Sequence, residues 1–375
     1  MTDLYIGLMS GTSMDGVDGA LVDFSTQKPS VTQVFTAQLA PELRAELLAL
    51  NTAGHNELHR AALAANALAR TYAQAVHALL ERSGLQASRI KAIGAHGQTV
   101  RHQPQMHDAT GYTVQLNNPA LLAELTGIDV VADFRSRDVA SGGQGAPLAP
   151  FFHCAWFATN AATQPIGVLN LGGISNLTIL QPDGVTLGFD CGPANALLDM
   201  CCQQHTSAAY DDSGAWGASG AVNAALLQAM LAEPYFALPP PKSTGRDLFN
   251  RAWLDKHLSA FPQEAPQNVQ KTLVELTAST VNTCSSSYEI SSNLKLGEVI
   301  VCGGGAYNTD LMQRLQALMP HCPVISSQER GLPPQDVEAT AFAWLAKQTI
   351  ERKPLPLSSV TGAHGARVLG CVYPA

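Results

Sequence analysis

Closely spaced glycines, hydroxyl groups and carboxylates fill residues 10–19 of this 375-residue chain, between apolar runs at residues 4–9 and 20–24. This pattern predicts a strand, a polar turn and a second strand. Glycines allow backbone N–H groups to converge on an anion, and the two carboxylates can hold a divalent cation through water. The segment therefore predicts a phosphate-binding loop that lacks a lysine, although an ordinary hairpin loop fits this segment equally well.

The same pattern returns about 160 residues later, and this repetition favours the phosphate-binding interpretation. Residues 166–179 again form an apolar run, a turn containing Gly172 and Gly173, and a second apolar run. The period is too long for a solenoid, whose repeats are 20–50 residues long. We therefore expect two similar domains, each of which offers a phosphate-facing hairpin to a shared cleft.

Polar clusters follow two further predicted strands in the first half of the chain. The strand at residues 90–95 leads into residues 96–102, and the strand at 128–132 leads into residues 133–138 and then the glycine-rich segment 142–147. Open α/β sheets bind ligands beyond the carboxyl ends of their strands. We expect an arginine here to bind a carboxylate while the glycines allow close approach to the ligand, and a salt-bridged surface turn is the alternative.

Two strand ends in the second half also carry polar or glycine-rich segments. Asp190 follows a predicted strand at residues 186–189, where it can act as a base or a metal ligand, or merely cap the next helix. The strand at residues 299–302 leads into three glycines, 303–305, that lack GxGxxG spacing. These glycines indicate either close approach to a nucleotide or a plain strand-to-helix turn.

Composition limits the classes of protein to consider. The chain is 46% hydrophobic and 14% charged, with a formal net charge of -8, so it can bury a large core in two or three domains and lacks a basic face for nucleic acid. No apolar run approaches membrane-spanning length and no basic segment opens the chain, so we expect a cytoplasmic protein. The eight cysteines show neither CxxC nor zinc spacing, and we expect them to be reduced and mostly buried.

Seven motifs, in order along nearly the whole chain, give it a family resemblance. They are GTSMDGVD (11–18), HGQTVRH (96–102), ADFRSRDVASGGQGAPLAP (132–150), NLGGISNLT (170–178), FDCGPAN (189–195), STGRDLFN (243–250) and CGGGAYN (302–308). Together they resemble the anhydro-N-acetylmuramic acid kinase family. The resemblance implies an α/β protein with the two-domain, actin-like ATPase fold, a duplicated RNase H-like fold around a central cleft.

This resemblance also predicts domain boundaries and an activity. Domain I would comprise residues 1–130 and 353–375, and domain II residues 131–352. The family's activity is the conversion of 1,6-anhydro-N-acetylmuramic acid, ATP and water into N-acetylmuramic acid 6-phosphate and ADP, in recycling of the bacterial cell wall. The P-loop motif GxxxxGK[ST] is absent from the sequence, so glycine N–H groups, hydroxyls and Mg²⁺ would hold the nucleotide.

The motifs assign roles to individual residues. Asp190 would be the catalytic base, and beside it Cys191 stands where the family pattern has threonine, a change that affects packing more than charge. Asp15 and Asp18 are our candidates for the water shell of Mg²⁺. The ATP-binding residues would be Gly11, Thr12, Ser13, Met14, Asp15, Gly16, Val17, Asp18, Gly172, Gly173, Gly303, Gly304 and Gly305.

The small sugar substrate carries a carboxylate, which needs a cationic or donor-rich partner. We expect Arg135 and His96 to bind it, Asp133 to bind a hydroxyl or orient Arg135, and Glu338 to contact the sugar or simply favour the helix dipole. Two rival classes stay open at this point: another sugar or carboxylate kinase of the same fold, and a non-catalytic actin-like nucleotide-binding protein. The sequence also leaves open whether the protein forms a homodimer.

Overall fold

The computed structural model describes residues 3–11, 14, 16–26, 28–158, 163–240 and 242–375, and the chain divides into two compact units. Unit 1 comprises Met1–Trp156 and Asp336–Ala375, and unit 2 comprises Phe157–Gln335. These boundaries differ from the predicted ones, because residues 131–156 and 336–352 belong to unit 1. Of the helices in the described residues, none is long and apolar enough to cross a membrane.

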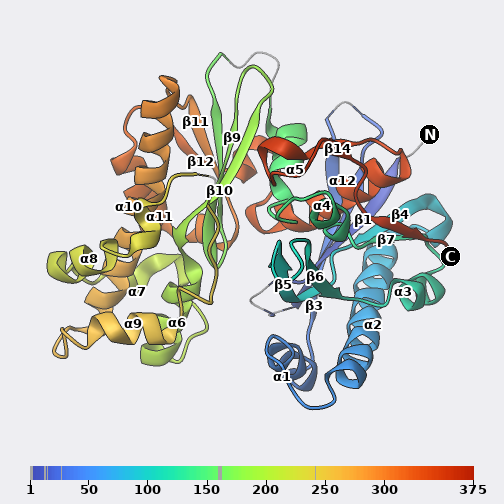
Figure 1. The fold of residues 1–375 in the computed structure, drawn as a ribbon, viewed down its shortest axis with the longest axis horizontal. Helices are drawn as coiled ribbons and strands as arrows, with labels where there is room; N and C mark the ends of the chain where they lie inside the picture. The colour runs from blue at the N-terminus through green and yellow to red at the C-terminus, as the bar shows by residue number, and fades with distance from the viewer. Residues whose placement is uncertain (1–2, 12–13, 15, 27, 159–162, 241) are drawn as a thin grey trace. The chain divides into compact units, whose positions relative to one another are not determined.

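The sheet of unit 1 has the strand order β15-β7-β4-β1-β2-β3 (Figure 1). Strands β1 and β4 are parallel, as are β4 and β7, whereas β2 runs antiparallel to both β1 and β3. The bounds are β1 Leu4–Met9, β2 Gly16–Asp23, β3 Ser30–Gln38, β4 Ile90–Ala95, β7 Val130–Ala132 and β15 Cys371–Tyr373. Two small hairpins accompany it: β5 Gln98–Pro104 with β6 Gly111–Leu116, and β13 Leu355–Pro356 with β14 Ala366–Arg367.

Alternating side chains of β1 build two cores, one on each face of this sheet. Leu4, Ile6 and Leu8 pack into a cluster with the long helix α2, and Tyr5 packs into a second cluster with α12. This is the period-2 alternation expected of a strand that is covered on both faces. The helices of unit 1 are α1 Pro41–Ala49, α2 Glu57–Ser83, α3 Pro119–Thr126, α4 Ser136–Ala140, α5 Ala149–Phe157 and α12 Val337–Ile350.

Helix α12 belongs to unit 1 because it lies directly on the backbone of the sheet. A Cβ added to Gly7 of β1 would lie 1.8 Å from the carbonyl oxygen of Ala339, and one on Gly94 of β4 would lie 2.0 Å from that of Phe342. Only glycine at both positions permits this close packing of helix on sheet. Strand β7 likewise pairs with β4. These contacts place α12 and β7 in unit 1, whereas the sequence assigned residues 131–352 to domain II.

The sheet of unit 2 repeats the same topology, with the order β10-β9-β8-β11-β12. Strand β9 is antiparallel to β8 and β10, while β8, β11 and β12 are parallel. The two units therefore confirm the predicted duplication. The bounds are β8 Ile166–Leu171, β9 Ile174–Leu180, β10 Thr186–Pro193, β11 Glu298–Cys302 and β12 Val324–Ser326.

Helices of unit 2 cover its sheet through one large apolar cluster, which includes Leu169 and Phe189 from strands and Leu197, Leu273 and Leu311 from helices. The long helix α10 is the central element of this layer (Figure 1). The eight cysteines are free thiols and six of them are buried, as the sequence predicted. The helices are α6 Asn195–Thr206, α7 Ala215–Ala218, α8 Ala224–Leu231, α9 Arg251–Leu258, α10 Pro266–Ser292 and α11 Thr309–Leu318.

Candidate active site

The first glycine hairpin is shorter than the sequence predicted. Strand β1 ends at Met9 and strand β2 begins at Gly16, and Asp18 pairs with Met9 across the hairpin. The side chains of Met14 and Val17 are buried in the core, and a Cβ on Gly16 would lie 2.8 Å from the carbonyl oxygen of Ala37. Within this hairpin, Met14 donates its N–H to the Gly11 carbonyl at 3.1 Å.

Part of the proposed phosphate-binding set lies outside the described residues. These positions are Thr12, Ser13 and Asp15, and the last was also a candidate for the metal's water shell. Packing within unit 1 explains the residue types at the described positions Met14, Gly16 and Val17. Any contact of these three with a ligand would therefore be made by the backbone, not by a side chain.

The charge of Asp18 influences two other carboxylates of unit 1, Asp336 and Glu338. Asp18 is exposed and accepts a hydrogen bond from the Thr36 hydroxyl at 2.7 Å. Burial and then the charge of Asp18 raise the pKa of Asp336 to about 6. Glu338 is accessible to solvent, yet the surrounding protein reduces its hydration and so raises its pKa. The negative charge of Asp18 raises this pKa further, whereas the positive charge of Arg135 lowers it. Unit 1 thus gathers negative charge at the start of α12.

The structure brings together His96 and Arg135, which follow β4 and β7. The Nε2 atom of buried His96 accepts hydrogen bonds from Nη2 (2.9 Å) and Nε (3.2 Å) of Arg135, and Nη1 of Arg135 donates to the Gly145 carbonyl at 2.8 Å. Burial and then the charge of Arg135 lower the pKa of His96 to about 3. Since arginine only donates, neutral His96 carries its proton on Nδ1. The only positive charge in this pair is therefore that of Arg135.

The chain around Arg135 is held by an aspartate whose role the sequence did not reveal. Asp138 is buried, and its carboxylate accepts hydrogen bonds from the Gly145 N–H (2.6 Å) and the Thr361 hydroxyl (2.6 Å). These bonds fix the glycine-rich segment that accepts from Arg135. Asp133, in contrast, is exposed, has a φ of 57°, and accepts from the Ser136 N–H at 3.3 Å, so it shapes the turn that precedes α4.

In unit 2, the second glycine hairpin is fixed against the start of α6. The Gly173 carbonyl accepts hydrogen bonds from the N–H groups of Ala194 and Ala196, and the Gly172 carbonyl accepts from that of Asn195, all at 3.0 Å. Neither glycine has a close neighbour in the direction of a side chain, since the nearest atoms to an added Cβ are 3.6 Å away or more. Packing within unit 2 therefore does not explain why these two residues are glycines.

The three glycines after β11 lie beside this hairpin. A Cβ on Gly303 would lie 2.4 Å from Oδ1 of Asn170, and one on Gly305 would lie 2.6 Å from Cβ of Leu171, so both must be glycine for the segment to pack on the end of β8. Gly304 has more space, with its nearest neighbour 3.4 Å away at Nδ2 of Asn195. The structure thus brings together the predicted second phosphate loop and the predicted adenosine segment.

Asp190 lies at an irregularity in the pairing of β10 with β9 and is held by the segment after residue 241. Its Oδ2 atom accepts hydrogen bonds from the Ser243 hydroxyl and the Thr244 N–H, both at 2.9 Å, and its own N–H donates to the Lys242 carbonyl at 3.0 Å. Burial raises the pKa of Asp190, while these two donors and the Lys242 charge oppose the increase. The carboxylate is oriented through one oxygen, so Oδ1 remains for another partner.

The motif at residues 243–250 contains residues for which the sequence predicts no individual role. Two hydroxyl residues beside a glycine and an arginine were the signal that could have drawn attention to it. What the sequence did not show is that this segment lies against β10, about 50 residues earlier in the chain. Ser243 and Thr244 are thus positioning residues for Asp190.

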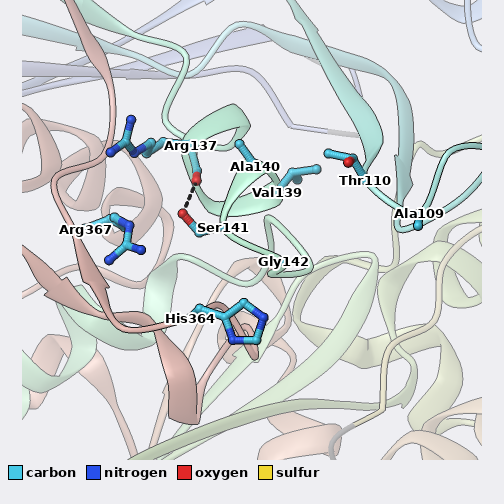
Figure 2. Close-up of a pocket in the computed structure, with 9 residues that line it drawn as sticks. All are labelled: Ala109, Thr110, Arg137, Val139, Ala140, Ser141, Gly142, His364 and Arg367. Carbon is cyan, nitrogen blue, oxygen red and sulfur yellow. Dashed lines mark hydrogen bonds between the residues drawn. The ribbon is translucent and has the colours of Figure 1, made fainter.

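A separate cavity of about 520 Å³ lies in unit 1 near the carboxyl end of α4 (Figure 2). Figure 2 shows Arg137, Ser141, His364 and Arg367 around it. None of the residues predicted for the site lines this cavity. The candidate functional residues are therefore those of the strand-end clusters within each unit, and not those that line this cavity.

The two units share a duplicated α/β topology in which polar segments follow corresponding strands. A model of the family described as anhydro-N-acetylmuramic acid kinase matches residues 3–375. The chain belongs to this family, and it is therefore a kinase that uses ATP.

Curated relatives and solved structures with similar chains accompany this match. The proteins named anhydro-N-acetylmuramic acid kinase from Albidiferax ferrireducens and Variovorax paradoxus are 59% and 57% identical to this chain; the first alignment covers 100% of both chains, the second 100% of this chain and 99% of the relative. A ROK family glucokinase from Streptomyces griseus aligns over 92% of this chain and 99% of its own, with 14% identity and a TM-score of 0.41.

Proposed function

We propose that this kinase hydrolyses the 1,6-anhydro bond of 1,6-anhydro-N-acetylmuramic acid and transfers the γ-phosphoryl group of ATP to O6. The products are N-acetylmuramic acid 6-phosphate and ADP, and the process served is cell-wall recycling. The observation that carries the chemical part of the proposal is the carboxylate of Asp190, which is oriented through Oδ2 and has a raised pKa. A base with these properties suits activation of water near neutral pH.

One carboxylate is sufficient for this reaction. Asp190 accepts a proton from water as the water oxygen bonds to C1 and the bond from C1 to O6 breaks. O6 then bonds to the γ-phosphorus as the bond from that phosphorus to the ADP oxygen breaks. Most glycosidases need a second carboxylic acid to protonate the leaving oxygen, but here the phosphoryl group captures it. The proton and both electron pairs are thus accounted for.

Arg135 is our proposed partner for the carboxylate of the sugar. Arginine has five N–H donors, of which three are engaged with His96 and Gly145. One donor therefore remains on each terminal nitrogen, and this pair suits bidentate binding of a carboxylate. His96 is neutral and acts by orienting Arg135, while Asp133 and Glu338 are proposed to contact sugar hydroxyls.

Backbone N–H groups of the two glycine hairpins are proposed to bind the phosphates of ATP. The carbonyls of Gly172 and Gly173 accept hydrogen bonds from the start of α6, so the hairpin has a fixed orientation. Neither residue has a side chain of its own, and an anion can therefore approach the backbone N–H groups closely. Gly11 would contribute to the first loop, together with Thr12, Ser13 and Asp15. Gly303, Gly304 and Gly305 would lie against the adenosine.

Mg²⁺ is proposed as the metal that offsets charge on the transferring phosphoryl group. Among the described residues no group of three or more His, Cys, Asp or Glu side chains is placed to hold a metal ion. The exposed carboxylate of Asp18 fits a water-mediated role, since Mg²⁺ keeps several waters and needs only one or two carboxylates besides phosphate oxygens.

Isotope labelling tests the reaction. The anhydro sugar, ATP and enzyme are incubated in ¹⁸O-labelled water, the reaction is quenched before the anomeric hydroxyl exchanges, and the products are analysed by mass spectrometry. We expect one ¹⁸O at C1 of the sugar product and none in its phosphate. Label in the phosphate, or a product that retains the anhydro bond, would contradict the proposal.

A further inference from the structure

Arg246 lies beside the second glycine hairpin. A Cβ placed on Gly173 would be 3.7 Å from Nη2 and 3.8 Å from Nε of Arg246, so the guanidinium lies over the open face of this glycine. Both distances are ordinary van der Waals contacts, so the guanidinium packs beside the backbone of the hairpin. An exposed cation therefore stands next to a loop whose backbone N–H groups are proposed to bind phosphate.

Arg246 also differs from the other three arginines of unit 2. Arg251 pairs with Asp255, Arg314 with Glu275 and Arg330 with Glu298. Over the part of the chain that the structure describes, Arg246 forms no ion pair and no hydrogen bond, and it is exposed. A guanidinium that is placed against a turn but has no carboxylate partner can bind an anion from solution.

The same short segment connects Arg246 to the proposed base. Ser243 and Thr244 donate to Oδ2 of Asp190, and only Gly245 separates them from Arg246. In the anhydro sugar, C1 and O6 are bonded to each other, so the group that activates water for C1 and the group that binds the phosphoryl arriving at O6 must act on neighbouring atoms. The segment at residues 243–246 therefore holds the donors to Asp190 and an exposed cation within four residues.

We propose that Arg246 binds the γ-phosphate of ATP above the Gly172–Gly173 hairpin and supplies the positive charge that this lysine-free loop otherwise lacks. This inference rests on the proposed function, because it assumes that the second hairpin binds phosphate. A planar guanidinium can bind two phosphoryl oxygens at once and stabilise the charge that they share during transfer. Binding of the γ-phosphate by Arg246 also fixes the segment that orients Asp190.

The test compares Arg246→Gln and Arg246→Lys with the wild-type enzyme by calorimetry, using ADP and a non-hydrolysable ATP analogue, and by steady-state kinetics. We expect Arg246→Gln to weaken binding of the ATP analogue by about 10- to 100-fold, the effect of one charged hydrogen-bonding group, and binding of ADP by less than about threefold. Its kcat should fall as well. Arg246→Lys should recover only part of the loss, since lysine keeps the charge but not the bidentate geometry.

Two further variants make the outcome specific. Arg251→Gln is the matched control, because Arg251 is an exposed arginine of unit 2 with its own partner, Asp255, and its loss should leave both affinities unchanged. Gly173→Ala tests the loop itself, and its methyl group would make only ordinary contacts of 3.6 Å or more, so the variant should fold. Thermal unfolding of every variant checks this expectation.

The results separate this inference from the proposed function. Weakened binding of the ATP analogue in both Gly173→Ala and Arg246→Gln, with ADP binding retained in the latter, supports both. If only Gly173→Ala weakens binding of the ATP analogue, the proposed role of Arg246 is wrong, and the proposal that the second hairpin binds phosphate is retained. Unchanged binding in both variants overturns the role of Arg246 and also the proposed phosphate-binding role of the second hairpin, because the phosphates would then bind elsewhere.

Discussion

The two units share one topology but carry opposite chemistry at the ends of their strands. In each, the second strand is antiparallel to the first, and two later strands run parallel to the first: β4 and β7 in unit 1, and β11 and β12 in unit 2. Unit 1 ends β4 and β7 with a neutral histidine hydrogen-bonded to a positively charged arginine, His96 and Arg135. Unit 2 ends β10 with a carboxylate, Asp190, that is held by uncharged donors.

This difference indicates that the shared sheet topology sets the positions of the strand ends, while the short segments after the strands set the charge and basicity of the side chains there. In unit 1, burial and the charge of Arg135 lower the pKa of His96 to about 3, so His96 is neutral near pH 7. In unit 2, burial raises the pKa of Asp190, and the hydrogen bonds from neutral donors only partly offset this increase. Unit 1 is thus suited to recognise an anion, and unit 2 to accept a proton.

Removal of the base should have the largest effect. Asp190→Asn retains the shape of the side chain and its place beside Ser243 and Thr244 but cannot accept a proton, so kcat should fall by about 10²- to 10⁴-fold. Affinity for the ATP analogue should change little. Steady-state kinetics with calorimetry provides the measurement, and Asp255→Asn, on the exposed surface of α9, is the control. A kcat of Asp190→Asn within threefold of the wild-type value would show that Asp190 is not the catalytic base.

An intermediate effect is expected for the cation of unit 1. Arg135→Gln should raise the KM for the anhydro sugar by about 10- to 100-fold, since it removes a charged hydrogen-bond donor from the sugar carboxylate, and should change the KM for ATP much less. Arg137→Gln is the matched control, because Arg137 lies two residues along, is exposed and lines the separate cavity. An unchanged sugar KM in Arg135→Gln would mean that unit 1 does not recognise the carboxylate in this way.

The smallest effect concerns the donors around Asp190 and is seen in the pH profile. The Ser243 hydroxyl lowers the pKa of Asp190, so Ser243→Ala should raise that pKa. Because the base must be deprotonated, activity is lost as the pH falls through its pKa, and the acidic limb of kcat/KM should move to higher pH. Ser259→Ala, at an exposed serine that bonds to the Lys256 carbonyl, should leave the limb in place. A limb that stays still in both variants would mean that Ser243 does not tune the base.

The sequence by itself determined the duplication and the positions of the main polar clusters. Apolar runs located β1, β4, β8 and β11, and residue types after these strands pointed to His96 and the glycines at 172–173 and 303–305. Such patterns are local, since strand periodicity and turn chemistry depend on neighbours in the sequence. Asp190 was found in the same way, from its place after a strand.

Only the tertiary structure decided which segments meet. The close contact of α12 with Gly7 and Gly94 placed residues 336–352 in unit 1, and no local pattern records such a contact. The donors to Asp190 and the cation beside Gly173 come from residues 243–246, more than 50 residues further along the chain. Hydrogen bonds and charges act across short distances in space whatever the separation in sequence, so residue roles of this kind become visible only once the chain is folded.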